Sequence, residues 1–254
     1  MTHDDGAMVH EQHMAELAAS FDRAADQYET ARPDYPDEAV GWLLGSHPRD
    51  VLDLGAGTGK LTRALVGRVS RLLAVDPSPN MLAQLSVAVP TAIVAVGTAE
   101  HIPLPDRSVD AVLVAQAWHW VDPEQAIPEV RRVLRPGGEL GLIWNVRDES
   151  VPWVAELTRI MHGSAAEQFV AEGAGIPTEL GPLQKQVFGW KRPFTRQSLL
   201  ALVRSRSYLI TAPSAERDQI LAGVNALLDT HPDLADPDAW SLPYQTEAFR
   251  ITVG

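Results

Sequence analysis

The stretch VLDLGAGTG, residues 51–59, decides the fold of this chain together with LLAVD at residues 72–76. The first stretch is a short apolar strand that breaks at once into three alternating glycines, and a helical segment opens at about Lys60. The second is another apolar strand, and it ends on the carboxylate of Asp76. Glycines at such a turn bring bare backbone against a ligand, and the acid accepts hydrogen bonds from ribose hydroxyls. The pattern therefore predicts the front half of a βαβ nucleoside-binding unit.

The spacing of the glycines narrows the choice of nucleoside. Dinucleotide sites usually read G-x-G-x-x-G over a pyrophosphate, whereas Gly55, Gly57 and Gly59 read G-x-G-x-G. Asp53, inside the preceding strand, would repel a pyrophosphate and attract an ammonium group. These features favour a zwitterionic nucleoside without phosphates. S-adenosylmethionine fits, with its ammonium near Asp53 or the glycine backbone and its ribose on Asp76.

Residues 50–146 carry further motifs at regular intervals and resemble the class I S-adenosylmethionine-dependent methyltransferases of type 11. These motifs are GTAE at 97–100, LPDRSVDAV at 104–112 and VRRVLRPGGEL at 130–140. The resemblance implies an α/β fold, a Rossmann-like, doubly wound, seven-stranded and mostly parallel sheet with an antiparallel last strand, a helical lid and insertions. It also implies S-adenosylmethionine as cofactor and S-adenosylhomocysteine as product.

Short, nearly continuous apolar runs predict five strands that are covered on both faces. They lie at about 50–54, 71–75, 91–96, 109–115 and 138–144, with helices at about 59–67, 79–87 and 123–134. Asp122 is a candidate N-cap for the last of these helices, with Pro123 at its first position.

Outside this core the pattern is looser. It predicts helices at 14–28, 151–169 and 215–229, a helix capped by Thr195, and strands at 185–194 and 245–253. A chain of 254 residues with 45% hydrophobic content can bury one large core, so a single domain is expected. Its regions are an N-terminal tail and lid (1–36), the cofactor-binding core (37–146), and substrate-side helical insertions with the last two strands (147–254).

The resemblance also places a set of residues around the cofactor. Met81 would pack against the adenine unless it is only a core methionine, and Ala99 and Glu100 would lie at the adenine edge unless Glu100 is only a solvated loop acid. The predicted cofactor-binding residues are Asp53, Gly55, Ala56, Gly57, Gly59, Asp76, Pro77, Met81, Ala99, Glu100, Gln116 and Tyr28.

The strand at 109–115 leads into a distinctive aromatic cluster of Trp118, His119 and Trp120. Ligands of open parallel sheets lie beyond the carboxyl ends of the strands, so this cluster should lie beside the sulfonium methyl group. Aromatic faces attract a cation and stack on a flat acceptor, which makes Trp118 and Trp120 candidate substrate-binding residues. His119 is the candidate general base, because its ordinary pKa lies near neutrality. The alternative is that the tryptophans only wedge the next helix and the histidine bonds to backbone.

The segment YETARPDYP, residues 28–36, together with the Trp-His-Trp cluster, resembles relatives of trans-aconitate methyltransferase, which methylate small carboxylic acids. In that branch the segment folds over the cofactor. Tyr28 would then lie near the methionine moiety, and Arg32 would neutralise a carboxylate of cofactor or substrate. The alternative is a proline-stiffened surface loop. Arg204 and Arg206 form a small basic spot that would bind an anion or pair with surface acids.

Bulk properties limit the partners. The formal net charge of −12 opposes binding to phosphate backbones, so nucleic acid is not expected. The absence of cysteine excludes disulfides and thiolate metal sites, and no other metal site is expected. No apolar run is long enough to span a membrane, and the N-terminus does not read as a secretory signal. We expect a cytoplasmic monomer or homodimer that acts on a small molecule.

The sequence thus favours a methyltransferase that transfers a methyl group by in-line displacement to a small-molecule acceptor, such as a carboxylate or phenol oxygen. A carboxylate needs no base, whereas a phenol or amine would use His119. Two alternatives remain: an NAD-dependent oxidoreductase on a related fold, and a catalytically silent S-adenosylmethionine-binding protein.

Overall fold

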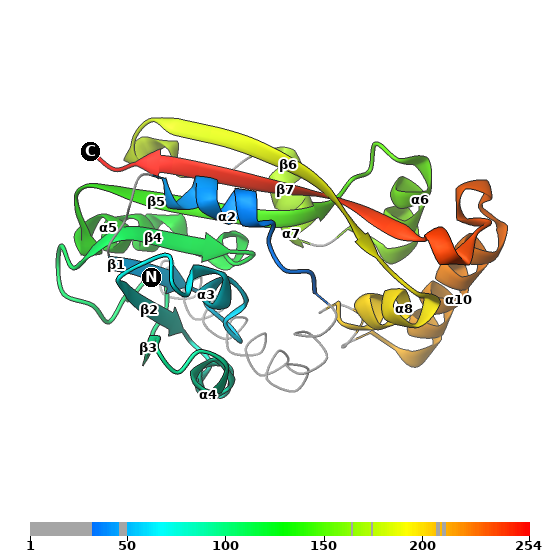
Figure 1. Ribbon diagram of the computed structural model, residues 1–254, viewed down its shortest axis with the longest axis horizontal. Helices are drawn as coiled ribbons and strands as arrows, with labels where there is room; N and C mark the ends of the chain where they lie inside the picture. The colour runs from blue at the N-terminus through cyan, green and yellow to red at the C-terminus, as the bar shows by residue number, and fades with distance from the viewer. Residues whose placement is uncertain (1–31, 46–49, 164, 174, 207–208, 210–211) are drawn as a thin grey trace, which may run out of the picture.

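The computed structural model describes residues 32–45, 50–163, 165–173, 175–206, 209 and 212–254. These residues form a seven-stranded sheet in the order β3-β2-β1-β4-β5-β7-β6 (Figure 1). Neighbours among β1 to β5 pair in parallel, and β7 runs antiparallel to both β5 and β6. The doubly wound sheet with its antiparallel strand is confirmed. The strands are β1 (Asp50–Leu54), β2 (Arg71–Asp76), β3 (Ile93–Val96), β4 (Val109–Ala115), β5 (Leu134–Arg147), β6 (Leu183–Pro193) and β7 (Ser241–Thr252).

Helices cover both faces of the sheet because the central strands are apolar on both sides. On one face α2 (Asp37–Leu44), α3 (Lys60–Leu65) and α4 (Pro79–Ala88) pack with residues such as Leu43, Leu61 and Leu85. On the other face lie α5 (Pro123–Val133) and α7 (Ala165–Glu172), with Val130 and Phe169 against the strands (Figure 1).

A second core lies where β6 and β7 extend beyond the other strands (Figure 1). There α6 (Pro152–Met161), α8 (Arg196–Arg204) and α10 (Ser214–Thr230) bury Leu157, Leu202 and Val224 together with Tyr244 of β7. This helical module, formed by α6, α8 and α10, lies within residues 147–254. The short 3-10 segments are η1 (Trp118–Trp120), η2 (Thr178–Leu180), η3 (Pro232–Leu234) and η4 (Pro237–Ala239).

Two predicted helix starts are confirmed by their caps. The Asp122 carboxylate accepts the Glu124 amide at 3.0 Å before α5, and the Thr195 hydroxyl accepts the Ser198 amide at 3.2 Å before α8. The residues between Glu100 and Arg107 hold no helix.

The single helix expected over 151–169 is wrong. The chain forms two helices, α6 and α7, which are separated at His162, whose φ is +52°. The physical reason is that the two segments bury their apolar faces in different cores. Trp153 of α6 packs in the helical module, whereas Phe169 of α7 packs against Trp144 of the sheet, with ring centroids 5.4 Å apart.

The helix expected at 14–28 and the lid residue Tyr28 lie outside the described residues. Within the described part of the chain, no helix has the length and apolar character needed to cross a membrane.

Candidate cofactor and acceptor site

The glycine turn follows β1 directly and requires glycine at its bends. Gly55, Gly57 and Gly59 have φ of +72°, +55° and +89°, a backbone region that residues other than glycine rarely adopt. A Cβ atom on Gly55 would lie 2.8 Å from the Ala117 Cβ, and one on Gly59 would lie 2.8 Å from the Leu85 Cγ. The turn therefore combines left-handed backbone with close packing on both sides.

Asp76, at the end of β2, is bonded to this turn. Its Oδ2 accepts the Gly57 amide at 2.8 Å and its Oδ1 accepts the Ser78 amide at 2.9 Å. The group is 8% exposed and lies against the glycine turn, where the sequence predicts a contact with the ribose hydroxyls. The Ser78 hydroxyl caps the Met81 amide at 3.1 Å. The Met81 sulfur lies 3.9 Å from where a Cβ on Gly57 would be, so this side chain borders the turn.

Asp53 is fully buried beneath the turn. Its Oδ2 accepts the Thr62 hydroxyl of α3 at 2.5 Å, whereas its Oδ1 has no hydrogen-bond partner among the residues that the structure describes. Burial raises the pKa of Asp53 to about 7, the Thr62 hydrogen bond opposes the rise, and the charge of Asp76 adds to it. An unpartnered carboxylate oxygen below the glycine turn fits the ammonium group of the predicted cofactor.

The other predicted cofactor residues surround this turn to different degrees. Ala56 is buried, and Pro77 is exposed next to Asp76. Ala99 belongs to the sheet core, so it can offer a ligand only backbone. The Glu100 carboxylate accepts the Asp122 amide at 2.9 Å and thereby ties its loop to the start of α5.

Gln116 follows β4 in a left-handed conformation with φ of +56°, which is uncommon for a residue with a side chain. Its backbone amide donates to the Ile143 carbonyl at 2.9 Å and its side-chain amide donates to the Asn145 carbonyl at 3.1 Å. Both bonds fix the residue to β5. Strained backbone of this kind is concentrated at functional sites, and here it lies at the carboxyl end of the central strands.

The aromatic cluster after β4 divides between core and site. Trp118 is only 2% exposed, and its indole N–H donates to the Gly175 carbonyl at 3.0 Å. Its ring is therefore part of the sheet core, as in the wedge alternative, and does not line an open surface. Trp120 is half-buried, and its ring centroid lies 4.6 Å from that of His119.

His119 is held in one protonation state. Its Nδ1 accepts the Trp144 indole N–H at 3.3 Å, so in the neutral ring Nε2 carries the proton. Burial lowers the pKa of His119 to about 4, and the charge of Arg32 acts in the same direction. At neutral pH the imidazole is uncharged, its one lone pair is engaged, and its other ring nitrogen is a hydrogen-bond donor.

The segment that contains Arg32 lies against the carboxyl ends of the strands. The Asp34 carbonyl accepts the side-chain amide of Asn145, at the end of β5, at 3.1 Å. The Asp34 carboxylate pairs with Lys60, directly after the glycine turn, at 3.0 Å. These two contacts place the segment between the turn and β5, and the charge of Arg32 in this segment contributes to the lowered pKa of His119.

The basic spot is arranged differently from the expectation. Arg204 is exposed on α8, whereas Arg206 is buried and shares Glu167 with Arg147 of β5. Arg206 and Arg147 lie 59 positions apart, and no local pattern in the sequence brings them together. They meet because Glu167 of α7, a helix that packs on β5, contacts both side chains.

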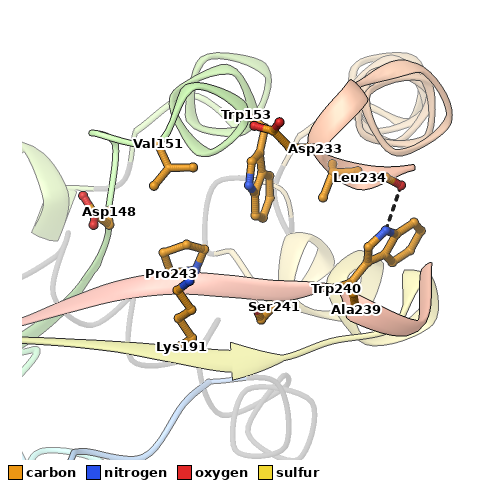
Figure 2. A pocket seen from close by; sticks show the side chains of 10 residues that line it. All are labelled: Asp148, Val151, Trp153, Lys191, Asp233, Leu234, Ala239, Trp240, Ser241 and Pro243. Carbon is orange, nitrogen blue, oxygen red and sulfur yellow. Dashed lines mark hydrogen bonds between the residues drawn. The ribbon is translucent and has the colours of Figure 1, made fainter. Parts of the chain in front are cut away.

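A cavity of about 260 Å³ lies in the helical module (Figure 2). Trp153 and Trp240 contribute rings to its wall, and the Trp240 N–H donates to the Leu234 carbonyl at 2.9 Å. None of the predicted cofactor residues lines this cavity, so it is separate from the site at the strand ends.

Comparison with known proteins agrees with the geometry. A family model described as "Methyltransferase domain" matches residues 52–142, from β1 into β5. An uncharacterized methyltransferase of Mycobacterium tuberculosis is 51% identical over 238 residues, which is 94% of this chain and 97% of the relative. An uncharacterized methyltransferase-like protein of Schizosaccharomyces pombe is 36% identical over 91% of this chain and 94% of its own length.

Among solved structures, a provisionally assigned type II methyltransferase of Anaeromyxobacter dehalogenans superposes with a TM-score of 0.67 at 25% identity. The match covers 87% of this chain and 97% of the other. The similarity to these proteins therefore extends beyond residues 52–142.

Proposed function

The chain belongs to the class I S-adenosylmethionine-dependent methyltransferases, and from that premise we propose that it methylates an oxygen of a small-molecule acceptor that is already anionic. The proposed cofactor contacts are those at the glycine turn: Asp76 for the ribose hydroxyls, Asp53 for the ammonium group, and Met81 beside the adenine. When bound, the cofactor supplies an electrophilic methyl group, so the protein has to align the acceptor and exclude water rather than activate the methyl donor.

The observation that carries the choice of acceptor is the hydrogen bond from Trp144 to His119. With Nδ1 engaged and the pKa lowered to about 4, His119 is a poor proton acceptor but a good donor through Nε2. A donor at this position orients an oxygen that carries its own negative charge. A neutral phenol or an ammonium group would first need to lose a proton, and the aromatic cluster offers no second base in its described residues.

The residues around the cluster suit this role. The Trp120 ring lies beside His119, Arg32 adds positive charge nearby, and Gln116 and Asn145 fix the strand ends. We assign Trp120 and Arg32 to the acceptor side. Trp118 has a packing role, because its ring is buried and its N–H is satisfied within the protein.

Purified protein incubated with methyl-labelled S-adenosylmethionine and a panel of small acids, phenols and amines tests this proposal. Methyl ester formation from acids is the expected result. Turnover of amines alone would refute the assignment of the acceptor, and cofactor binding without turnover of any acceptor in a cell extract would favour the catalytically silent alternative.

A further inference from the structure

Two arginines from distant parts of the chain meet in the interior at the acceptor side of the sheet. Arg147 ends β5 and Arg206 follows α8, and their side chains are 1% and 7% exposed. Both contact Glu167 of α7: the Arg147 Nη2 lies 3.0 Å and the Arg206 Nη2 lies 3.5 Å from its Oε1. The Arg147 Nε also donates to the Thr158 hydroxyl at 3.0 Å. One carboxylate therefore forms ion pairs with two buried guanidinium groups.

This cluster has more positive charge and more donors than the described protein satisfies. The Arg147 Nη1 and the Arg206 Nε are buried and have no hydrogen-bond partner among the described residues. Burial lowers the pKa of Arg147 to about 10, and the neighbouring charge of Arg206 contributes to the decrease. Leaving buried charged donors unpaired is costly, and it is unexpected in a chain with a net charge of −12.

The cluster lies at the same strand end as the candidate site. Arg147 is two positions after Asn145 of β5, whose carbonyl accepts the Gln116 side-chain amide and whose own side chain donates to the Asp34 carbonyl. Burial raises the pKa of Tyr244, which pairs with Arg147 across β7 and β5, and the charges of Arg206, Arg147 and Arg32 all oppose that rise. Arg32 also acts on His119. The charge of Arg32 therefore acts both on Tyr244 beside the cluster and on His119 after β4.

We propose that Arg147 and Arg206 form a subsite for a carboxylate of the methyl acceptor, one that is not itself methylated. This inference rests on the proposed function and specifies its substrate class as small acids with at least two anionic oxygen groups. Two unpaired donors match the two oxygens of a carboxylate. Two guanidiniums less the charge of Glu167 leave about one positive charge, which suits a carboxylate better than a doubly charged phosphate.

Calorimetry on the full chain saturated with S-adenosylhomocysteine tests the subsite directly. The probes are succinate and glutarate, their neutral diamides succinamide and glutaramide, and inorganic phosphate. We expect the dicarboxylates to bind at least tenfold tighter than the diamides and tighter than phosphate. Arg147→Gln and Arg206→Gln should each weaken dicarboxylate binding at least tenfold. Arg159→Gln, at a mostly exposed arginine of α6, is the matched control and should change nothing.

A variant that is expected to bind dicarboxylates more tightly separates a binding role of the cluster from a purely structural one. Glu167→Gln removes the charge that competes for both arginines, so succinate should bind severalfold tighter than to the wild type. A cluster that served only folding would show no gain in affinity. Arg147→Lys keeps the charge and should recover part of the affinity lost in Arg147→Gln. If Arg147→Gln does not fold, Arg206→Gln and Glu167→Gln decide the matter.

The outcomes distinguish this inference from the function on which it rests. A wild-type protein that does not bind S-adenosylhomocysteine would overturn the proposed function. Normal S-adenosylhomocysteine binding with equal affinity for dicarboxylates and diamides, or with phosphate as the tightest probe, would overturn the subsite alone.

Discussion

Replacement of Asp53 by asparagine should stabilise the protein and weaken its cofactor binding at the same time. Burial moves the pKa of this carboxyl from 3.8 to about 7, so above pH 7 the folded state holds a charge that water would solvate better. The difference corresponds to about 4 kcal/mol of lost stability. The asparagine side chain would keep the shape and could still accept the Thr62 hydroxyl through its oxygen, without the charge.

The pH dependence gives this prediction its sign. Because the folded pKa is raised, the penalty is absent below pH 3.8, grows as the unfolded chain ionises, and is complete above pH 7. Urea unfolding of the ligand-free protein should therefore show that Asp53→Asn raises the free energy of unfolding by up to about 4 kcal/mol at pH 8. At pH 5 the increase should be less than half as large. Asp218→Asn, at an exposed carboxylate of α10, should give no gain at either pH.

Cofactor binding supplies the second half of the test. The charge of Asp53 attracts the ammonium group, so calorimetry at pH 8 should show S-adenosylhomocysteine bound roughly tenfold or more weakly by Asp53→Asn, about 1.5 kcal/mol. A variant that gained stability but bound the ligand normally would disprove the ammonium contact. A variant with the same stability gain at pH 5 and pH 8 would disprove the buried charge.

Three further predictions concern the same site. Asp76→Ala should weaken S-adenosylhomocysteine binding by about 1.5–3 kcal/mol in calorimetry, and unchanged affinity would rule out the ribose contact. His119→Gln should leave that affinity within about twofold. Because the pKa of His119 in the folded state is lowered to about 4, the wild-type free energy of unfolding should be at its full value above pH 6.5 and should fall by about 3 kcal/mol relative to that of the variant toward pH 4. A difference in urea unfolding that does not change with pH would contradict this. Gly59→Ala should cost about 2 kcal/mol or more in the same assay, because its φ of +89° and the Leu85 side chain exclude a Cβ, and a variant of wild-type stability would contradict the turn geometry.

The sequence by itself determined the part of the fold from β1 to β5. The motif from Val51 to Gly59, the acid at Asp76 and the regular apolar runs are local patterns, and each depends on residues that are close together in the chain. Strand-to-helix turns and caps such as Asp122 depend on the same short range, so their positions followed from residue type and spacing. The antiparallel last strand followed from the family resemblance.

Only the tertiary structure decided the arrangement around the carboxyl end of β5. The helix breaks at His162 because α6 and α7 pack in different cores. Helical periodicity in the sequence does not indicate which core each segment packs in. The tautomer of His119 depends on Trp144, 25 positions away, and the buried charge cluster depends on Arg147 and Arg206, 59 positions apart. Hydrogen bonds and desolvation depend on which groups are neighbours in space, not on which are neighbours in the sequence. The protonation and pairing of these groups are therefore fixed by the elements that the fold brings together.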